Sequence, residues 1–210
     1  FVVIGAQKCA TSWMYYCLKD HPEICVPTKK LEAGYIGGTM YNENGTEWFF
    51  HRFKRGNEKI QGDISVEYLY DSSTAEALAP FLAEEPRFLL SLRNPVDRLI
   101  SGYYWLVRRG KIENLPLEKG LAPILDQPAG FPKTLHEPLE EVVRRSCYGP
   151  QLDAFLDRYG EQHFFIVLYE DIELNGLKAI QQVFGFLDVD ASFCPPSISL
   201  EPKRNSYNPW

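Results

Sequence analysis

The stretch FVVIGAQKCATSWMYYCLKDHP, residues 1–22, predicts a strand that feeds a helix through a short loop of small and polar residues. The apolar, β-branched run over residues 1–4 is typical of a buried strand, and an amphipathic pattern begins near Thr11. The first turn of a helix leaves backbone N–H groups without helical partners, and the macrodipole favours negative charge there. Lys8 adds a cation inside the loop, and Thr11 and Ser12 add hydroxyl donors. These residues predict a binding site for a phosphate-type anion.

The loop differs from the one that binds nucleoside triphosphates, although its length is similar. The triphosphate loop reads G-x-x-x-x-G-K-[ST], with the lysine directly before the hydroxyl residue that binds magnesium. Here Ala10 occupies the position of the second glycine, Thr11 occupies that of the lysine, and the loop's only lysine is Lys8. The sequence also shows no convincing acidic strand end that would hold Mg²⁺. An ordinary strand-to-helix turn is the alternative to an anion site.

The motif G-A-Q-K-C-A-T-S, followed by His21 and Pro22 at the helix end, resembles the 5′-phosphosulfate loop of PAPS-dependent sulfotransferases. PAPS, 3′-phosphoadenosine 5′-phosphosulfate, is the sulfuryl donor of that family. The family's common form is G-x-x-K-x-G-T-T with H-P at the helix end, so this chain departs from it at Ala10 and Ser12, both small residues. The resemblance implies that Lys8 is catalytic. It also implies that the donor is bound by six loop residues, Gln7, Lys8, Cys9, Ala10, Thr11 and Ser12.

A second segment, RFLLSLRNPVDRLISGYYW at residues 87–105, predicts a buried strand, a turn and a helix. Asn94 and Pro95 open that helix, because asparagine is a favoured N-cap and proline suits the first helical position. An ordinary interpretation therefore makes Asn94 a helix cap and places Arg93 and Arg98 in surface ion pairs.

The same segment contains the pattern R-N-P-x-D-R-x-x-S-x-Y, which resembles the 3′-phosphate element of the sulfotransferase family. In that resemblance Arg93 and Ser101 bind the 3′-phosphate of the nucleotide. A guanidinium group suits a phosphate dianion because its planar donors match the phosphate oxygens. Both elements stand at strand-to-helix junctions and occur in the family's order, so together they indicate one nucleotide site.

The alternation of strand and helix patterns predicts a mainly parallel sheet flanked by helices, with the ligand at the carboxyl ends of the strands. The resemblance implies a three-layer α/β architecture, the P-loop-like sulfotransferase fold. We expect a single domain over residues 1–210 with an irregular insertion at about 110–138. Residues 28–57 show weak periodicity, which predicts a functional loop region. The expected strands are 1–4, 24–27, 59–65, 88–92 and 163–172, and the expected helices are 12–20, 73–85, 94–109, 139–159 and 174–187.

Composition limits the function without defining it. The net charge of −6 argues against a nucleic-acid-coating surface, whereas one nucleotide needs only a local positive pocket. The five cysteines are scattered and form no C-x-x-C pair or Cys/His cluster, which predicts a reduced, cytoplasmic chain without a metal site. The sequence contains no membrane span and no signal peptide. Because the chain begins inside a strand, an anchor or signal upstream is left open.

Two later segments extend the resemblance. Residues 146–172 read S-x-Y and then a strand ending Y-E-D, as in the family, although Glu170 and Asp171 equally suit a strand end that caps the next helix, the interpretation we favour. The proline-bounded segment PKRNSYNP at 202–209 suits either a solvated basic turn or the loop that closes on the nucleotide. The family interpretation assigns donor binding to Lys203, Arg204 and Asn205.

A general base should take the proton of the acceptor. Related carbohydrate sulfotransferases carry K-E-x-x-F-F after the second strand, with the glutamate as base, and residues 29–35 read K-K-L-E-A-G-Y here. Glu32 is the nearest candidate, although its register is displaced and both aromatic residues are absent. His51, Asp63 and Glu67 compete with it, and Asp63 lies in G-D-I-S, which resembles the family's G-E-K-S strand end at the acceptor site.

Together these expectations predict a sulfotransferase, which moves a sulfuryl group from PAPS to an acceptor and releases adenosine 3′,5′-bisphosphate (PAP). The acceptor that we expect is a hydroxyl of a carbohydrate, a hydroxyacyl chain on a carrier or a small natural product, with no nucleic acid, membrane span or metal involved. The first alternative is a P-loop kinase of a small metabolite that uses Mg-ATP. The second is a non-catalytic nucleotide-binding module on the same fold.

Overall fold

The computed structural model describes residues 1–29, 34–53, 56–125 and 137–200. Within these ranges the chain forms two compact units. The first contains residues 1–93 and 149–200, and the second contains residues 94–148. The described strands all belong to the first unit, so the sheet predicted from the alternating pattern is built there, whereas the second unit is helical.

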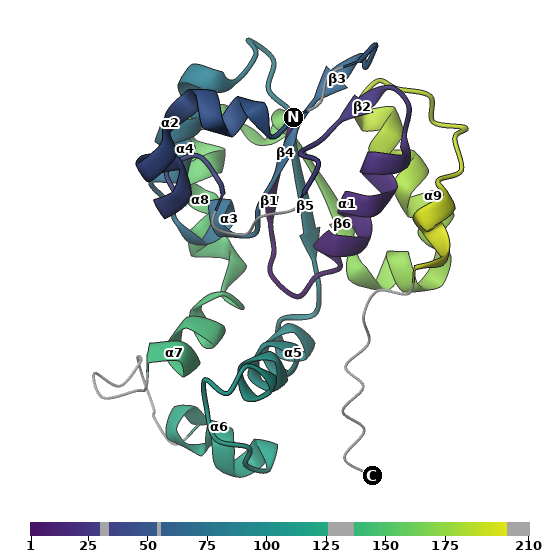
Figure 1. The fold of residues 1–210 in the computed structure, drawn as a ribbon. Coiled ribbons are helices and arrows are strands. Elements are labelled where there is room, and N and C mark those ends of the chain that lie inside the picture. Colours follow the sequence, from purple (N-terminus) through teal and green to yellow (C-terminus); the bar gives the residue numbers. More distant parts are fainter. Residues whose placement is uncertain (30–33, 54–55, 126–136, 201–210) are drawn as a thin grey trace. The chain divides into compact units, whose positions relative to one another are not determined.

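The first unit is built on a four-stranded parallel sheet (Figure 1). The strand order is β4 (Asp63–Ile64), β1 (Val2–Gly5), β5 (Phe88–Leu92) and β6 (Phe164–Leu168). Val3 pairs with Ile64 on one side and with Leu89 on the other, and Gly5 pairs with Leu90. The carboxyl ends of β1 and β5 therefore lie side by side. A separate parallel pair joins β2 (Ile24–Cys25) to β3 (Ile60–Gln61).

Helices cover both faces of the four-stranded sheet (Figure 1). On one face lie α1 (Thr11–Asp20) and α9 (Tyr169–Phe186), and their buried residues pack with β1 and β5 in the main apolar core. On the other face lie α2 (Thr39–His51), α3 (Glu67–Tyr70), α4 (Thr74–Leu78) and α8 (Tyr148–Tyr159). There Phe155 packs against Phe88, with 5.6 Å between the ring centroids. The expected three-layer α/β architecture is confirmed.

The second unit consists of α5 (Pro95–Arg108), α6 (Leu117–Leu125) and α7 (Glu137–Arg144). Its small core joins Tyr103 to Leu121 and Leu139. Asn94 caps α5 as expected, because its side-chain oxygen accepts from the first backbone N–H groups of the helix. Arg98, in contrast, does not lie at the surface. Its side chain is fully buried and donates to the carbonyl oxygen of Val142.

Several elements differ from the sequence-based expectation. The expected loop region at 28–57 contains the helix α2. Gly45 interrupts the helical pattern in the sequence, and in the structure it breaks the helical backbone with a φ of 79°. The expected strand at 59–65 is two short strands, β3 and β4, in different sheets. The expected irregular segment at 110–138 contains α6, and the expected helix at 139–159 is divided between α7 and α8.

The remaining described elements are the 3₁₀ helices η1 (Ala79–Phe81), η2 (Glu161–His163) and η3 (Pro196–Ser199). The helix expected at 73–85 is shorter than expected. The helix α4 ends at Leu78, and only the 3₁₀ helix η1 follows it, ending at Phe81. Among the described residues, no helix combines the length and the apolar character that crossing a membrane requires.

Candidate functional site

The loop between β1 and α1 has the backbone shape of an anion site. Lys8 and Ala10 both adopt left-handed conformations, with φ of 71° and 63°. Backbone turns of this kind direct successive N–H groups into one concavity, which binds anions. Ala10 is the N-cap residue of α1, and its methyl side chain cannot accept a hydrogen bond from the first turn. The helix start is therefore suited to an external anion rather than to a capping side chain.

Ala10 stands where the motif that this loop resembles has glycine, and its conformation is left-handed. A residue with a β-carbon pays about 1–2 kcal/mol in this region of conformational space, whereas glycine adopts it freely. In this chain alanine adopts this conformation, with a φ of 63°. Alanine at this position is therefore compatible with a left-handed turn at the start of α1.

The loop is attached to the neighbouring strand β5. The Ala6 N–H donates to the Ser91 carbonyl oxygen over 2.8 Å, and the Ser91 hydroxyl donates to the Cys9 carbonyl oxygen. Arg93 follows Ser91 by two residues and directly follows the end of β5. The loop that carries Lys8 and the residue Arg93 thus extend from adjacent strands at the same edge of the sheet. That both serve one nucleotide stays a prediction.

Tyr169, which the sequence-based assignment missed, contacts Arg93. The guanidinium carbon of Arg93 lies 4.3 Å from the centroid of the Tyr169 ring, in cation–π geometry. Tyr169 directly follows β6, begins α9 and is 3% exposed. Tyr169 is the first residue of the Y-E-D pattern at residues 169–171, which is the sequence signal for this position. Glu170 and Asp171 lie in the first turn of α9, where they complement the helix dipole. The expectation that they end the strand and cap the helix is wrong, because β6 ends at Leu168 and Leu168 is also the N-cap residue of α9.

The other predicted donor-binding residues fall into different parts of the chain. Ser101 lies on α5 in the second unit, where its side chain is buried. Its role at the 3′-phosphate stays a prediction. Outside the described residues lie Glu32, Lys203, Arg204 and Asn205.

Asp63, one competitor for the role of base, belongs to a buried polar network. One carboxylate oxygen lies 3.3 Å from Arg52 Nη2, and the other accepts from the Tyr68 hydroxyl over 2.7 Å. The Tyr68 hydroxyl in turn accepts from the Ile36 N–H over 3.0 Å. Burial raises the pKa of the Asp63 carboxyl, and the positive charge of Arg52 opposes that rise. Both oxygens of Asp63 are therefore engaged in holding this part of the first unit together.

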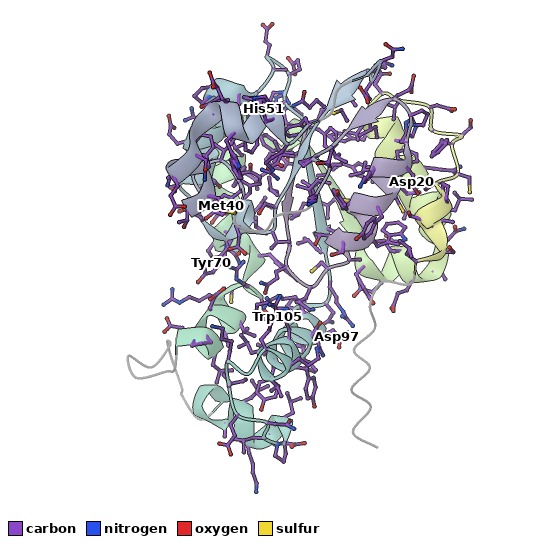
Figure 2. All side chains as sticks on the ribbon, in the orientation of Figure 1. Asp20, Met40, His51, Tyr70, Asp97 and Trp105 are labelled. Carbon is purple, nitrogen blue, oxygen red and sulfur yellow. The ribbon has the colours of Figure 1, made fainter. Side chains whose placement is uncertain are left out.

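The two remaining competitors are His51 and Glu67. His51 is the last residue of α2 and lies at the amino ends of the strands (Figure 2). Tyr70, the last residue of the short helix α3 that begins with Glu67, lies near their carboxyl ends (Figure 2). Glu67 is in the first turn of α3, which follows β4 and packs against β1. Of these two side chains, Glu67 belongs to an element at the same edge of the sheet as the anion loop.

Comparison with known proteins identifies relatives of this chain and of its fold. The model of the sulfotransferase domain family matches residues 1–206. The membrane-associated sulfotransferase kil1 of Dictyostelium discoideum is 31% identical over 156 residues, which cover 69% of this chain and 32% of kil1. The bifunctional heparan sulfate N-deacetylase/N-sulfotransferase 2 of Bos taurus is 20% identical over 200 residues, which cover 90% of this chain and 22% of that enzyme.

One solved structure is similar to this chain in both fold and sequence. A sulfotransferase from Alicyclobacillus acidocaldarius matches with a TM-score of 0.78 and 27% identity, covering 94% of this chain and 83% of that one. The chain spans about a third or less of the length of the two curated relatives. Both relatives and the solved structure favour the sulfotransferase interpretation over a small-metabolite kinase. Because the family model covers nearly all of its residues, this chain belongs to the sulfotransferase domain family.

Proposed function

We propose that this chain transfers a sulfuryl group from PAPS to a hydroxyl acceptor and releases PAP. The observation that carries the proposal is the placement of the Lys8 loop and Arg93 at adjacent parallel strand ends, joined through Ser91. A donor with phosphates on both its 3′ and 5′ positions needs two anion sites at one edge of a sheet. The family match supports the same donor.

The residues present fit such a donor. The left-handed turns at Lys8 and Ala10 and the start of α1 suit the 5′ end, where Gln7, Cys9, Thr11 and Ser12 would also contact it. Arg93, oriented by the ring of Tyr169, suits the 3′-phosphate. We further assign Ser101, Lys203, Arg204 and Asn205 to donor binding on the strength of the sequence motifs.

The reaction breaks the bond between sulfur and the bridging phosphate oxygen, forms a bond between sulfur and the acceptor oxygen, and passes the acceptor proton to a base. By analogy with phosphoryl transfer, the transition state is loose, so positioning and electrostatics dominate. Negative charge grows on the bridging oxygen as its bond to sulfur breaks. Lys8 and the loop N–H groups stabilise that charge where it develops.

We assign the base to Glu32, on its position after the second strand in the sequence. The engagement of both Asp63 oxygens with Arg52 and Tyr68 supports a structural role for Asp63 instead. For the acceptor we propose a hydroxyl of a carbohydrate, a hydroxyacyl chain or a small natural product. The relative named for heparan sulfate supports the carbohydrate among these three, but its name gives transfer to nitrogen, so it does not support the hydroxyl.

Titration calorimetry of PAP against ATP, each with and without Mg²⁺, tests the donor. We expect PAP to bind without Mg²⁺ and at least about tenfold more tightly than ATP, because ATP lacks the 3′-phosphate that forms charge-assisted hydrogen bonds with Arg93. Tight ATP binding that requires Mg²⁺ would contradict the proposal and favour the kinase. PAP binding without transfer to any acceptor would favour the non-catalytic module.

A second prediction concerns Tyr169. Tyr169→Leu removes the ring under the Arg93 guanidinium, and we expect the dissociation constant of PAP to rise about 3- to 30-fold, as a partly desolvated cation–π contact predicts. Tyr169→Phe keeps the ring and should remain within about threefold of wild type. Calorimetry with PAP measures both. Equal losses in the leucine and phenylalanine variants would show that the hydroxyl matters and that the ring does not orient Arg93.

A further inference from the structure

Ser91 is a buried polar residue in an otherwise apolar strand. β5 reads F-L-L-S-L, and the Ser91 side chain is fully buried. A buried hydroxyl needs a hydrogen-bond partner, because an unpaired one costs free energy in an apolar environment. Its partner here is not in β5 or in another strand but in the anion loop, at the carbonyl oxygen of Cys9. The loop therefore provides the reason for a serine at this position.

Two atoms of Ser91 attach the two limbs of the loop. On the strand side, the Ser91 carbonyl oxygen accepts from the Ala6 N–H over 2.8 Å. On the helix side, the Ser91 hydroxyl donates to the Cys9 carbonyl oxygen. The Cys9 N–H donates to the Ala6 carbonyl oxygen over 3.3 Å and closes the base of the loop. The residues between Ala6 and Cys9, which include Lys8, are thus held from both ends.

The bond to Cys9 also sets the direction of the next N–H group. In a trans peptide unit the C=O and the N–H point in opposite directions. With the Cys9 carbonyl held on β5, the N–H of Ala10 points away from the strand, at the start of α1. Ala10 keeps the left-handed conformation that this orientation needs, with a φ of 63°. Without the hydroxyl of Ser91, this peptide unit loses the hydrogen bond that opposes its rotation toward a less strained conformation.

We propose that Ser91 is a positioning residue of the donor site, which holds the Cys9–Ala10 peptide so that its N–H is offered to the 5′-phosphate. This inference rests on the proposed function, because it takes the 5′ end of the donor to lie at the loop. It assigns Ser91 no contact with the donor. Its effect passes through the backbone of Cys9 and Ala10, and it is specific to the 5′ side of the ligand.

The test compares two nucleotides that differ only at the 5′ position, PAP and adenosine 3′-monophosphate. In Ser91→Ala we expect the dissociation constant of PAP to rise about tenfold, because one N–H bond to a charged group is lost or misdirected. The dissociation constant of adenosine 3′-monophosphate should stay within about twofold of wild type. Competition calorimetry measures both, and thermal unfolding of the same samples measures stability.

Thr74→Val is the matched control. The Thr74 hydroxyl is also fully buried, and it also donates to backbone carbonyl oxygens, those of Tyr68 over 2.6 Å and Asp71 over 2.7 Å. We expect this variant to lose comparable stability and to bind both nucleotides as wild type does. Ser91→Cys keeps the size of the side chain with a weaker donor, so it should give an intermediate loss for PAP and allows the test if Ser91→Ala fails to fold.

The outcomes separate the two proposals. Equal weakening of both nucleotides in the Ser91 variants, or weakening of neither, would overturn the role of Ser91. If the wild-type protein itself binds PAP no better than adenosine 3′-monophosphate, the loop is not the 5′ site, and the proposed function fails with it. Selective loss for PAP in the Ser91 variants, with the Thr74 control unchanged, supports the positioning role.

Discussion

Lys8→Ala is expected to lower the turnover number about 10²- to 10³-fold while changing the dissociation constant of PAP only about tenfold or less. Lys8 lies in the loop that begins α1, where negative charge would grow on the bridging oxygen in the transition state. An interaction that strengthens between ground state and transition state affects turnover more than binding. Removing one such stabilising donor from an enzyme typically lowers the turnover number about 10²- to 10³-fold.

The measurement is release of PAP from PAPS. The acceptor should be whichever gives the wild-type protein the highest rate among desulfated glycosaminoglycans, simple glycosides and hydroxyacyl thioesters. Lys19→Ala is the control. Lys19 lies in the last turn of α1, the helix that follows the Lys8 loop, and it donates to the Thr28 carbonyl oxygen at the surface. This control should keep wild-type turnover. Full transfer by Lys8→Ala would remove Lys8 from the mechanism.

The second large effect concerns stability rather than catalysis. Asp63→Ala leaves the Arg52 guanidinium buried without its carboxylate partner, and Arg52 and Asp63 are only 9% and 6% exposed. Removing one partner of a buried ion pair costs about 3–5 kcal/mol, because the remaining charge stays desolvated. We expect the free energy of unfolding to fall by that amount, measured by urea denaturation at neutral pH.

Two further variants show whether the charge is responsible. Tyr68→Phe removes only a hydroxyl that donates to Asp63 and accepts from Ile36, so we expect a loss of about 1–3 kcal/mol. The double variant Asp63→Leu with Arg52→Met replaces both charges by apolar groups and should recover most of the stability lost in Asp63→Ala. If the double variant is as unstable as the single one, packing rather than an uncompensated charge explains the loss.

Local signals made part of the fold and site predictable from the sequence. The apolar run over 88–92 and the Asn94-Pro95 helix start follow from rules that act within a few residues, and both are confirmed. The strand β1, the loop that follows it and the start of α1 were predictable for the same reason. The helix α2 was missed because Gly45 interrupts its periodicity, and its position depends on packing against other elements, as in the contact between Tyr41 and Phe81 of η1.

Roles that arise from distant contacts could not be predicted in this way. Tyr169 supports Arg93, and Ser91 holds Cys9, across separations of 76 and 82 residues along the chain. The helix-start pattern predicts a surface position for Arg98, and only the fold of the second unit buries it. In each case the partner is set by which strands or helices become neighbours.

The methyl group of Ala10 has one more effect on this protein. A glycine in the same turn would sample many backbone shapes before a ligand arrives, and binding would have to select one of them. Alanine narrows that ensemble, so the cost of ordering the turn falls on folding rather than on recognition of the nucleotide. The strained alanine lowers the stability of the folded chain slightly, and in return the turn at Ala10 is already ordered before a ligand binds.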